Sequence, residues 1–148
     1  MGETQKIKKL PVQTLGKIYA SAENWDADAE IDGITFSLRP ASMNDDIVPV
    51  NGVLVAKLKR PRCVDVEFST CVREVCDNRP KVIDEWNVTI MESEFGDPKY
   101  PTTPTMRLEY KNFRPSSDKF EKGCLKVELK IGGEKFEAIE DAVYLNGW

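Results

Sequence analysis

Hydrophobic and polar residues alternate along much of this chain with a period of two. The clearest example is the segment 125–131, where four apolar residues alternate with three charged ones immediately before Gly132-Gly133. Successive side chains of a β-strand point to opposite faces of the sheet, so this pattern predicts a strand with one buried and one solvated face. Two adjacent glycines can both adopt positive φ in a two-residue hairpin turn, so we expect a second strand to return at 134–139.

Similar segments recur along the chain and are separated by proline, glycine and acidic residues that favour turns. The expected strands span 14–22, 34–39, 53–59, 63–68, 82–91, 106–113, 125–131 and 134–139, and 141–145 either extends the last one or pairs separately. The segment 69–80 is irregular, and Val72, Val75 and Cys76 have the spacing of one short helical turn. The pattern as a whole predicts an all-β chain that folds as an antiparallel β-sandwich of about seven to eight strands.

The chain length favours one domain, with a flexible N-terminal arm at residues 1–11 and a single β-sandwich domain at residues 12–148. With 148 residues, of which 41% are hydrophobic and 31% charged, the chain can bury a core without needing disulfides or metals. The formal net charge of −4 offers no basic excess for binding phosphates. We therefore expect a soluble protein that does not bind nucleic acid.

Histidine is absent from the sequence, which narrows the chemistry open to this protein. Histidine is the commonest general base and a frequent zinc ligand, so Ser-His-Asp catalysis, Cys-His catalysis and histidine-based metal sites are excluded. Carboxylate, lysine, tyrosine and cysteine chemistry remain open, but no spacing selects a catalytic pair. We therefore predict that the protein is not an enzyme and has no catalytic residues.

The compartment follows less directly from the sequence. No run of about 18 apolar residues is present, so no membrane span is expected. The first residues are polar and basic and lack the apolar centre of a signal peptide. The prediction is therefore a cytoplasmic protein, or an extracellular one if the chain is a mature domain trimmed from a longer precursor.

Four cysteines, Cys63, Cys71, Cys76 and Cys124, leave the redox state open. Their spacing does not match the paired C-x2-C motifs of zinc ribbons, and no histidine can complete a mixed zinc site. Free or buried thiols are one interpretation. The other is one or two disulfides, for which the local options are Cys71–Cys76 or a bond from Cys63 to either of them.

The number of short strands and the turns between them resemble the immunoglobulin-like and transthyretin-like sandwich folds. Within the chain, the run from Asp32 to Pro40, followed by Val48-Pro49 and Gly52, is similar to a pattern in small sandwich domains attached to envelope and secreted proteins. The resemblance is at the level of the fold and covers a minor part of the chain. It implies a sandwich architecture and no functional residue.

One acidic segment has the residue types of a calcium loop. Calcium is bound by several oxygen ligands, and carboxylates at alternate positions closed by a glycine can surround one ion. The segment ends at Gly33, and its candidate metal ligands are Asp26, Asp28, Glu30 and Asp32. The twelfth position from Asp28 is Arg39 instead of a bidentate glutamate, so a further ligand has to come from elsewhere. The candidates, if their loops share one end of the sandwich, are Glu92, Glu94 and Asp97. A solvated acidic loop is the alternative.

Two other groups of residues are candidate binding surfaces. A basic run either meets an anionic partner or lies on the solvated face of a strand, and its members are Lys57, Lys59, Arg60 and Arg62. Aromatic residues in loops can stack on sugar rings, and the candidates outside the predicted strands are Trp25, Tyr100 and Trp148. Packing at the ends of the core is the alternative for these aromatics.

These observations favour a non-enzymatic β-sandwich that acts as a binding or interaction module, because rigid sheets can hold irregular loops as recognition surfaces. The expected partner is a protein or a carbohydrate, and the sequence does not determine the oligomeric state. One alternative is a calcium-stabilised sandwich that binds carbohydrate, with calcium as its only cofactor. A second alternative is an enzyme that uses carboxylates or a reactive cysteine.

Overall fold

The computed structural model describes residues 11–26, 31–60, 63–68, 71–76, 81–115 and 122–145. Segments 63–68 and 71–76 are described by their backbone alone. All strand pairs within these ranges are antiparallel, and the one helical segment in them is the short 3-10 turn η1 (Glu92–Phe95). The prediction of an antiparallel all-β chain is therefore confirmed.

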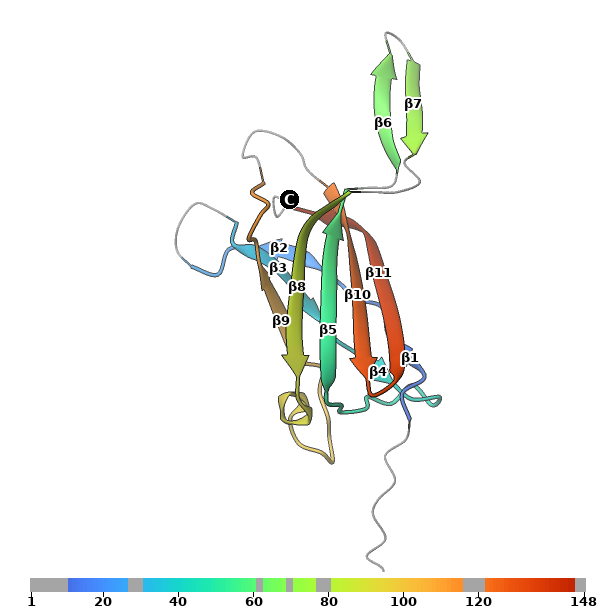
Figure 1. Cartoon of the computed structure of the whole chain (residues 1–148), viewed down its shortest axis with the longest axis vertical. Coiled ribbons are helices and arrows are strands. Elements are labelled where there is room, and N and C mark those ends of the chain that lie inside the picture. Colours follow the sequence, from blue (N-terminus) through green and yellow to red (C-terminus); the bar gives the residue numbers. More distant parts are fainter. Residues whose placement is uncertain are drawn as a thin grey trace, which may run out of the picture.

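A four-stranded sheet forms one layer of the fold (Figure 1). In spatial order its strands are β11 (Glu134–Tyr144), β10 (Lys122–Ile131), β5 (Gly52–Lys59) and β8 (Val82–Ile90). The hairpin of β10 and β11 turns at Gly132-Gly133 as predicted, but φ is positive only at Gly132, where it is 59°. A type II′ turn needs positive φ at its first central position alone, which explains the difference.

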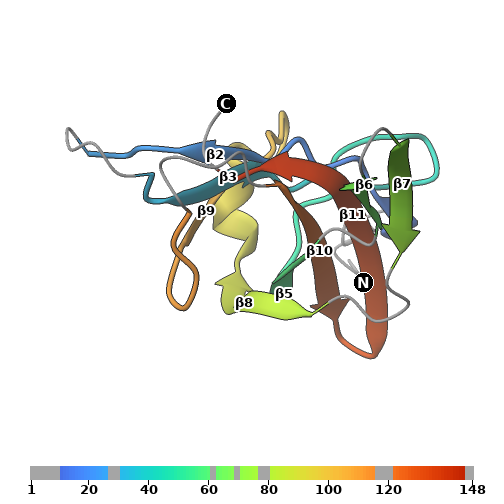
Figure 2. The same cartoon turned by 90° about the horizontal axis from the view of Figure 1, so that it is seen from above.

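The other layer is a three-stranded sheet that faces the first (Figure 2). Its strands, in spatial order, are β2 (Ser21–Glu23), β3 (Gly33–Ser37) and β9 (Thr105–Glu109). A small separate pair consists of β1 (Thr14–Leu15) and β4 (Pro40–Ala41). Both β1 and β2 contact β11, so the two layers meet along that side. The arrangement is compatible with a β-sandwich.

The core lies between the two layers and is made of the apolar positions that the alternation selects. On β10 the inner residues Leu125, Val127 and Leu129 are fully buried, whereas the charged residues between them keep some exposure. Buried residues of the other predicted strands include Ile34, Phe36, Leu38, Leu54, Ala56, Leu58, Trp86, Ile90, Met106 and Leu108. Burial of such side chains is the main favourable term in folding, so the alternating pattern accounts for most of the core.

The segment 14–22, which the alternation predicts as one strand, forms two short strands in different sheets. After β1, the backbone N–H of Gly16 donates to the carbonyl of Arg39 at 2.8 Å, whereas β2 pairs with β3. Ile18, between the two strands, is fully buried. Leu15 in β1 is also buried but lies three residues before Ile18, so the period of two is interrupted where the chain changes its pairing partner.

The helical turn considered for 69–80 is wrong for the part of that segment that the structure describes. Residues Cys71–Cys76 form strand β7, which pairs with β6 (Cys63–Phe68). Val72 and Val75 are β-branched and fit a strand. A helix of so few residues is marginal, whereas pairing with β6 provides partners for backbone groups of both strands.

Candidate functional site

Trp25 lies on the outer face of the three-stranded sheet, just after β2. Its indole N–H donates to the hydroxyl of Thr35 at 3.1 Å, and that hydroxyl donates to a carboxylate oxygen of Glu23 at 3.0 Å. The guanidinium of Arg107 stands over the indole ring, 5.5 Å from its centroid. The partly buried indole is therefore held on the outer face of the sheet by a hydrogen bond and a cation–π contact, and it does not pack at an end of the core.

Tyr100 and Trp25 do not form a common platform. Tyr100 is 78% exposed and precedes the start of β9, whereas Trp25 lies beside Gly33, which is paired with the last residue of β9. The two aromatics therefore lie towards opposite ends of the three-stranded sheet. Trp148 is outside the described residues, so the sugar platform stays a prediction.

Of the four predicted calcium ligands, Asp28 and Glu30 fall outside the described residues. One carboxylate oxygen of Asp32 accepts the backbone N–H groups of Trp25 at 2.6 Å and of Asp26 at 3.3 Å. Asp32 therefore closes the loop between β2 and β3, as short polar side chains do in turns. In the part of the chain that the structure describes, no three acidic, cysteine or histidine side chains are grouped to hold a metal. Calcium binding stays a prediction.

The extra calcium ligands considered in other loops lie towards the opposite end of the three-stranded sheet. Glu92 and Glu94 belong to η1, and Asp97 follows them before β9 starts, whereas Asp32 immediately precedes β3. Because β3 and β9 are antiparallel, the start of β9 lies beside the end of β3 and not beside its beginning. The expectation that these loops share one end is therefore wrong.

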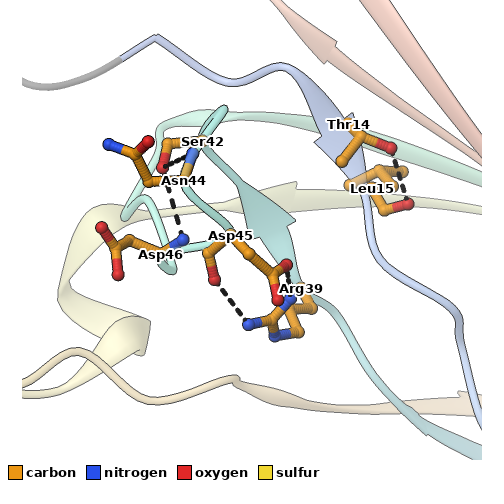
Figure 3. Close-up of polar contacts among 7 residues, drawn as sticks. All are labelled: Thr14, Leu15, Arg39, Ser42, Asn44, Asp45 and Asp46. Atoms are coloured by element: carbon orange, nitrogen blue, oxygen red, sulfur yellow. Dashed lines mark hydrogen bonds and ion pairs between the residues drawn. The ribbon is translucent and has the colours of Figure 1, made fainter.

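Two side chains, one from the loop after β4 and one from the residue before β4, hydrogen-bond to this loop (Figure 3). The hydroxyl of Ser42, a buried residue, accepts the backbone N–H groups of Asn44 and Asp46, each at 3.3 Å. The guanidinium of Arg39 donates to the carboxylate of Asp45 at 2.6 Å and to its carbonyl at 2.7 Å. These bonds hold Asp45 at a φ of 67°, which residues other than glycine adopt infrequently. The side chains of Ser42 and Arg39 therefore fix this loop through four hydrogen bonds.

Lys57, from the predicted basic run, lies on the outer face of the four-stranded sheet, where it is paired across to Lys126. Lys126 forms ion pairs with Glu128 at 3.4 Å and with Glu137 at 3.8 Å. Burial raises the pKa of Glu128, but the nearby lysines, chiefly Lys135 and Lys126, outweigh burial and leave the pKa below its ordinary value. Lys57 therefore belongs to a solvated face of mixed charge, as the alternative interpretation expects.

Replacing Glu128 with Gln is expected to lower the free energy of unfolding by about 0.5–1 kcal/mol at neutral pH, because surface ion pairs are lost. A carboxylate whose pKa is lower in the folded state stabilises the protein above its unfolded pKa of about 4.3. That stabilisation disappears as the pH falls through the folded pKa. Urea unfolding measured from neutral to acid pH is expected to show the free energies of unfolding of wild type and variant becoming equal below the folded pKa of Glu128. A difference that stays constant with pH contradicts the assignment.

Asp84 is a buried carboxyl group that the sequence analysis did not single out. It is 2% exposed and lies on β8. One of its oxygens accepts the backbone N–H groups of Lys111 at 2.8 Å and Asn112 at 3.3 Å, and the other accepts that of Glu85 at 3.0 Å. The donors from 111 and 112 lie just beyond β9, which explains why the strand predicted at 106–113 ends at Glu109. Asp84 therefore ties one layer to the other.

A second bond joins the layers near Asp84, because the indole N–H of Trp86 donates to the carbonyl of Glu109 at 2.7 Å. The sequence did contain a signal for both of these contacts between the layers. In the predicted strand 82–91, alternation places an aspartate on the same face as Trp86, and a buried acid needs hydrogen-bond donors. Both residues serve the fold and leave no polar group for a ligand.

Cys124 lies at an irregularity in the pairing of β10 and β11, with its sulfur 3.9 Å from a carboxylate oxygen of Asp141. Burial, followed by the charge of Asp141, raises the pKa of this thiol, and the nearby Lys59 offsets only part of the rise. Cys124 is a free thiol. The thiolate is the nucleophilic form of cysteine, so these surroundings disfavour the reactive form.

The hairpin of β6 and β7 projects beyond the end of the four-stranded sheet, between the end of β5 and the start of β8 (Figure 1). Among the described elements, its two strands pack extensively only against each other. Two-stranded hairpins are marginally stable alone in water, and their outer edges offer backbone groups to another strand. The hairpin is therefore our candidate interaction site.

The hairpin carries more negative than positive charge. Its strands contain Asp65, Glu67 and Glu74 but one basic residue, Arg73. The register sets Asp65 directly opposite Glu74. Like charges at facing positions destabilise a sheet, so a basic surface beside the hairpin would relieve a local penalty.

The end of the four-stranded sheet at the base of the hairpin carries four basic residues, and the acidic residues Glu140 and Asp141 lie beside them near Cys124. We call this surface the basic shoulder, and its residues are Lys59, Arg60, Lys81 and Lys122. Two contacts bring these residues together. The backbone N–H of Arg60 donates to the carbonyl of Lys81 at 3.0 Å. Lys59 is paired across the sheet with Cys124, which follows Lys122 by two residues on β10. Within the side chains that the structure describes, none of the four forms an ion pair. Arg62, the last member of the predicted basic run, is not among the described residues.

No protein family model matches this chain, and neither a curated protein nor a solved structure shows significant similarity to it. A helix long and apolar enough to cross a membrane is not found among the described residues. The hairpin and the basic shoulder are the arrangement from which a function can be argued.

Proposed function

We propose that this protein is a non-enzymatic interaction module in which a β-sandwich presents the β6–β7 hairpin to a partner. The observation that carries the proposal is that β6 and β7 pack extensively only against each other among the described elements. The immunoglobulin-like or transthyretin-like architecture is part of the same proposal, and two antiparallel layers that face each other support it. Sandwiches of this kind commonly hold recognition elements at their ends.

The hairpin gains stability when a partner adds to it. Three or more strands are needed for a sheet to be independently stable in water, and addition of a strand to an open edge is a common mode of protein recognition. Both β6 and β7 are edge strands in the described chain, because their sheet has two strands. Pairing with a strand of another chain would therefore give the hairpin the third strand that the sandwich does not supply.

The partner that the charges favour is a second copy of this chain. The acidic hairpin and the basic shoulder of one chain carry opposite charges. In a dimer with a two-fold axis, the hairpin of each copy can therefore lie beside the shoulder of the other copy. Such an interface is self-complementary, as most dimer interfaces are. Charges arranged in this way fix the register of the two copies and speed their encounter.

The non-enzymatic part of the proposal is supported by how the buried or reactive groups are used. The carboxyl group of Asp84 accepts three backbone N–H groups and serves the fold. The raised pKa of Cys124 keeps its thiol protonated, which is unfavourable for a nucleophile. Neither residue has the environment of a catalytic group.

The test is sedimentation velocity from about 1 to 100 μM protein, the range in which weak dimers form. Wild-type protein is expected to show dimer that decreases between about 0.05 and 0.5 M NaCl, because salt screens exposed charges. The hairpin variant Asp65→Lys/Glu67→Lys and the shoulder variant Lys59→Glu/Lys81→Glu are each expected to be monomeric. An equal mixture of the two variants is expected to restore a dimer, because the opposite charges again face each other.

The matched control is Lys99→Glu/Lys130→Glu, which makes the same charge change at the end of the molecule away from the hairpin. This control is expected to dimerise as the wild type does. A wild-type chain that is monomeric over the whole concentration range rejects the second copy as partner. Two variants that stay monomeric when mixed, although each is folded by circular dichroism, reject the hairpin–shoulder contact.

A further inference from the structure

We propose that Cys63 and Cys76 form a disulfide across the base of the β6–β7 hairpin. The antiparallel register sets the first residue of β6, Cys63, directly opposite the last residue of β7, Cys76. Facing residues of antiparallel strands have Cα atoms about 4.5–5.5 Å apart, which lies within the range of about 4.4–6.8 Å that a disulfide spans. The backbone alone therefore meets the distance requirement for this bond.

The other local pairings fail the same requirement. Cys71 is paired with Phe68, so it lies five positions along the hairpin from both Cys63 and Cys76. A strand rises about 3.3 Å per residue, which separates Cys71 from either cysteine by roughly 16 Å. Cys124 lies on β10 with its sulfur beside Asp141. Of the disulfides that the sequence left open, the register selects one.

The bond forms by exchange with a small-molecule disulfide such as oxidised glutathione. The thiolate of one cysteine attacks this disulfide, forms a mixed disulfide and releases one glutathione thiolate. The thiolate of the second cysteine then attacks the protein sulfur of the mixed disulfide and releases the second glutathione. Two protein thiols are oxidised, one small-molecule disulfide is reduced to two thiols, and the two cysteine protons end on the glutathione released.

The consequence of the bond is a hairpin that is ordered before it meets a partner. A crosslink between residues 63 and 76 closes a short ring and removes conformations from the open state of the hairpin. This is the element that lacks extensive packing against the sandwich, so it has the most to gain from a covalent constraint. In oxidising surroundings the hairpin is rigid, and in reducing surroundings it opens more often. The inference does not depend on the proposed function, because the bond forms whether or not two copies associate.

The test is to incubate the whole protein at about 1 μM, below the range of weak association, with oxidised or with reduced glutathione. Free thiols are then alkylated under denaturing conditions and the protein is cut with trypsin and Glu-C. Cleavage after Arg62, Glu67 and Arg73 puts each hairpin cysteine on a different peptide. Mass spectrometry is expected to find the Cys63 and Cys76 peptides joined after oxidation, and Cys71 and Cys124 alkylated.

Hydrogen exchange measured on the same two samples reports the effect on the hairpin. Backbone amides of β6 and β7 are expected to exchange on the order of 10- to 100-fold more slowly in the oxidised protein, while those of β10 stay unchanged. Cys71→Ser is the matched control and is expected to retain both the crosslink and the slow exchange. Cys76→Ser is expected to lose both.

Three results overturn the inference. The first is complete alkylation of all four cysteines after oxidation. The second is a crosslinked peptide that contains Cys71 or Cys124. The third is a crosslink that runs between two chains, seen as a dimer on a non-reducing gel. The sedimentation experiment on the charge variants is carried out with reductant present, so its outcome is separate from that of the thiol mapping.

Discussion

Replacing Asp84 with Ala is expected to lower the free energy of unfolding by about 3 kcal/mol, because it leaves buried backbone donors without an acceptor. The carboxyl group of Asp84 accepts N–H groups of Lys111 and Asn112 from the other side of the core, as well as that of Glu85. With 2% exposure, the site is too enclosed for solvent to replace the lost acceptor readily. Urea denaturation followed by circular dichroism measures the change.

The matched control for Asp84→Ala is Glu85→Ala, which removes an exposed carboxylate from the next position of β8. This variant is expected to change the stability by no more than about 0.5 kcal/mol. Asp84→Asn keeps one oxygen as an acceptor and is expected to fall between the two. Equal stability of Asp84→Ala and Glu85→Ala would show that the carboxyl group does not join the layers.

Replacing Gly33 with Ala is expected to cost about 3 kcal/mol or more, because the added methyl group has no space in the three-stranded sheet. A Cβ atom there would lie 2.1 Å from the carbonyl oxygen of Leu108 and 2.9 Å from the Cα of Glu109. Both atoms belong to the backbone of β9, so relief requires the pairing of β3 with β9 to open. The same Cβ would lie 2.8 Å from the ring of Trp25.

Gly133→Ala is the matched control for Gly33→Ala, because nothing lies within 4 Å of the position that its Cβ would take. It is expected to change the stability by no more than about 0.5 kcal/mol. A change in tryptophan fluorescence of the folded Gly33→Ala protein would show that the indole of Trp25 has moved. If both alanine variants unfold at the same urea concentration, the close approach of β3 and β9 at this position is wrong.

Most of the core could be predicted from the period of two. The residues that it assigns to inner faces on β3, β5, β9 and β10 are buried, except Ile131 at the end of β10, which is partly buried. Alternation along a strand depends on local backbone geometry alone. The positions at which a strand ends and the chain changes sheets were harder to predict. Leu15 and Ile18 are both buried but lie three residues apart, because the chain passes from one sheet to the other between β1 and β2. The prediction of one continuous strand over 14–22 missed this shift in the alternation.

In the candidate site, too, the sequence shows the residues but not which of them face each other. The acids and cysteines of the hairpin are visible in the sequence, but their meaning depends on β7, which the irregular segment 69–80 concealed. Once β7 pairs with β6, Cys63 faces Cys76 and Asp65 faces Glu74. The same holds for Asp84. The alternation of the strand predicted its place on an inner face, but it did not predict the backbone N–H donors, which lie 27 and 28 residues away in the chain.

By itself, the sequence determined that the chain forms antiparallel strands and which side of most strands is buried, because side-chain alternation is set residue by residue. Only the tertiary structure decided the order of the strands, the split of 14–22, the two bonds that join the layers beside β8, and the projection of the hairpin from the sheet. These features depend on which distant segments find each other, and a backbone hydrogen bond between strands carries little information about the identity of the residues that it joins.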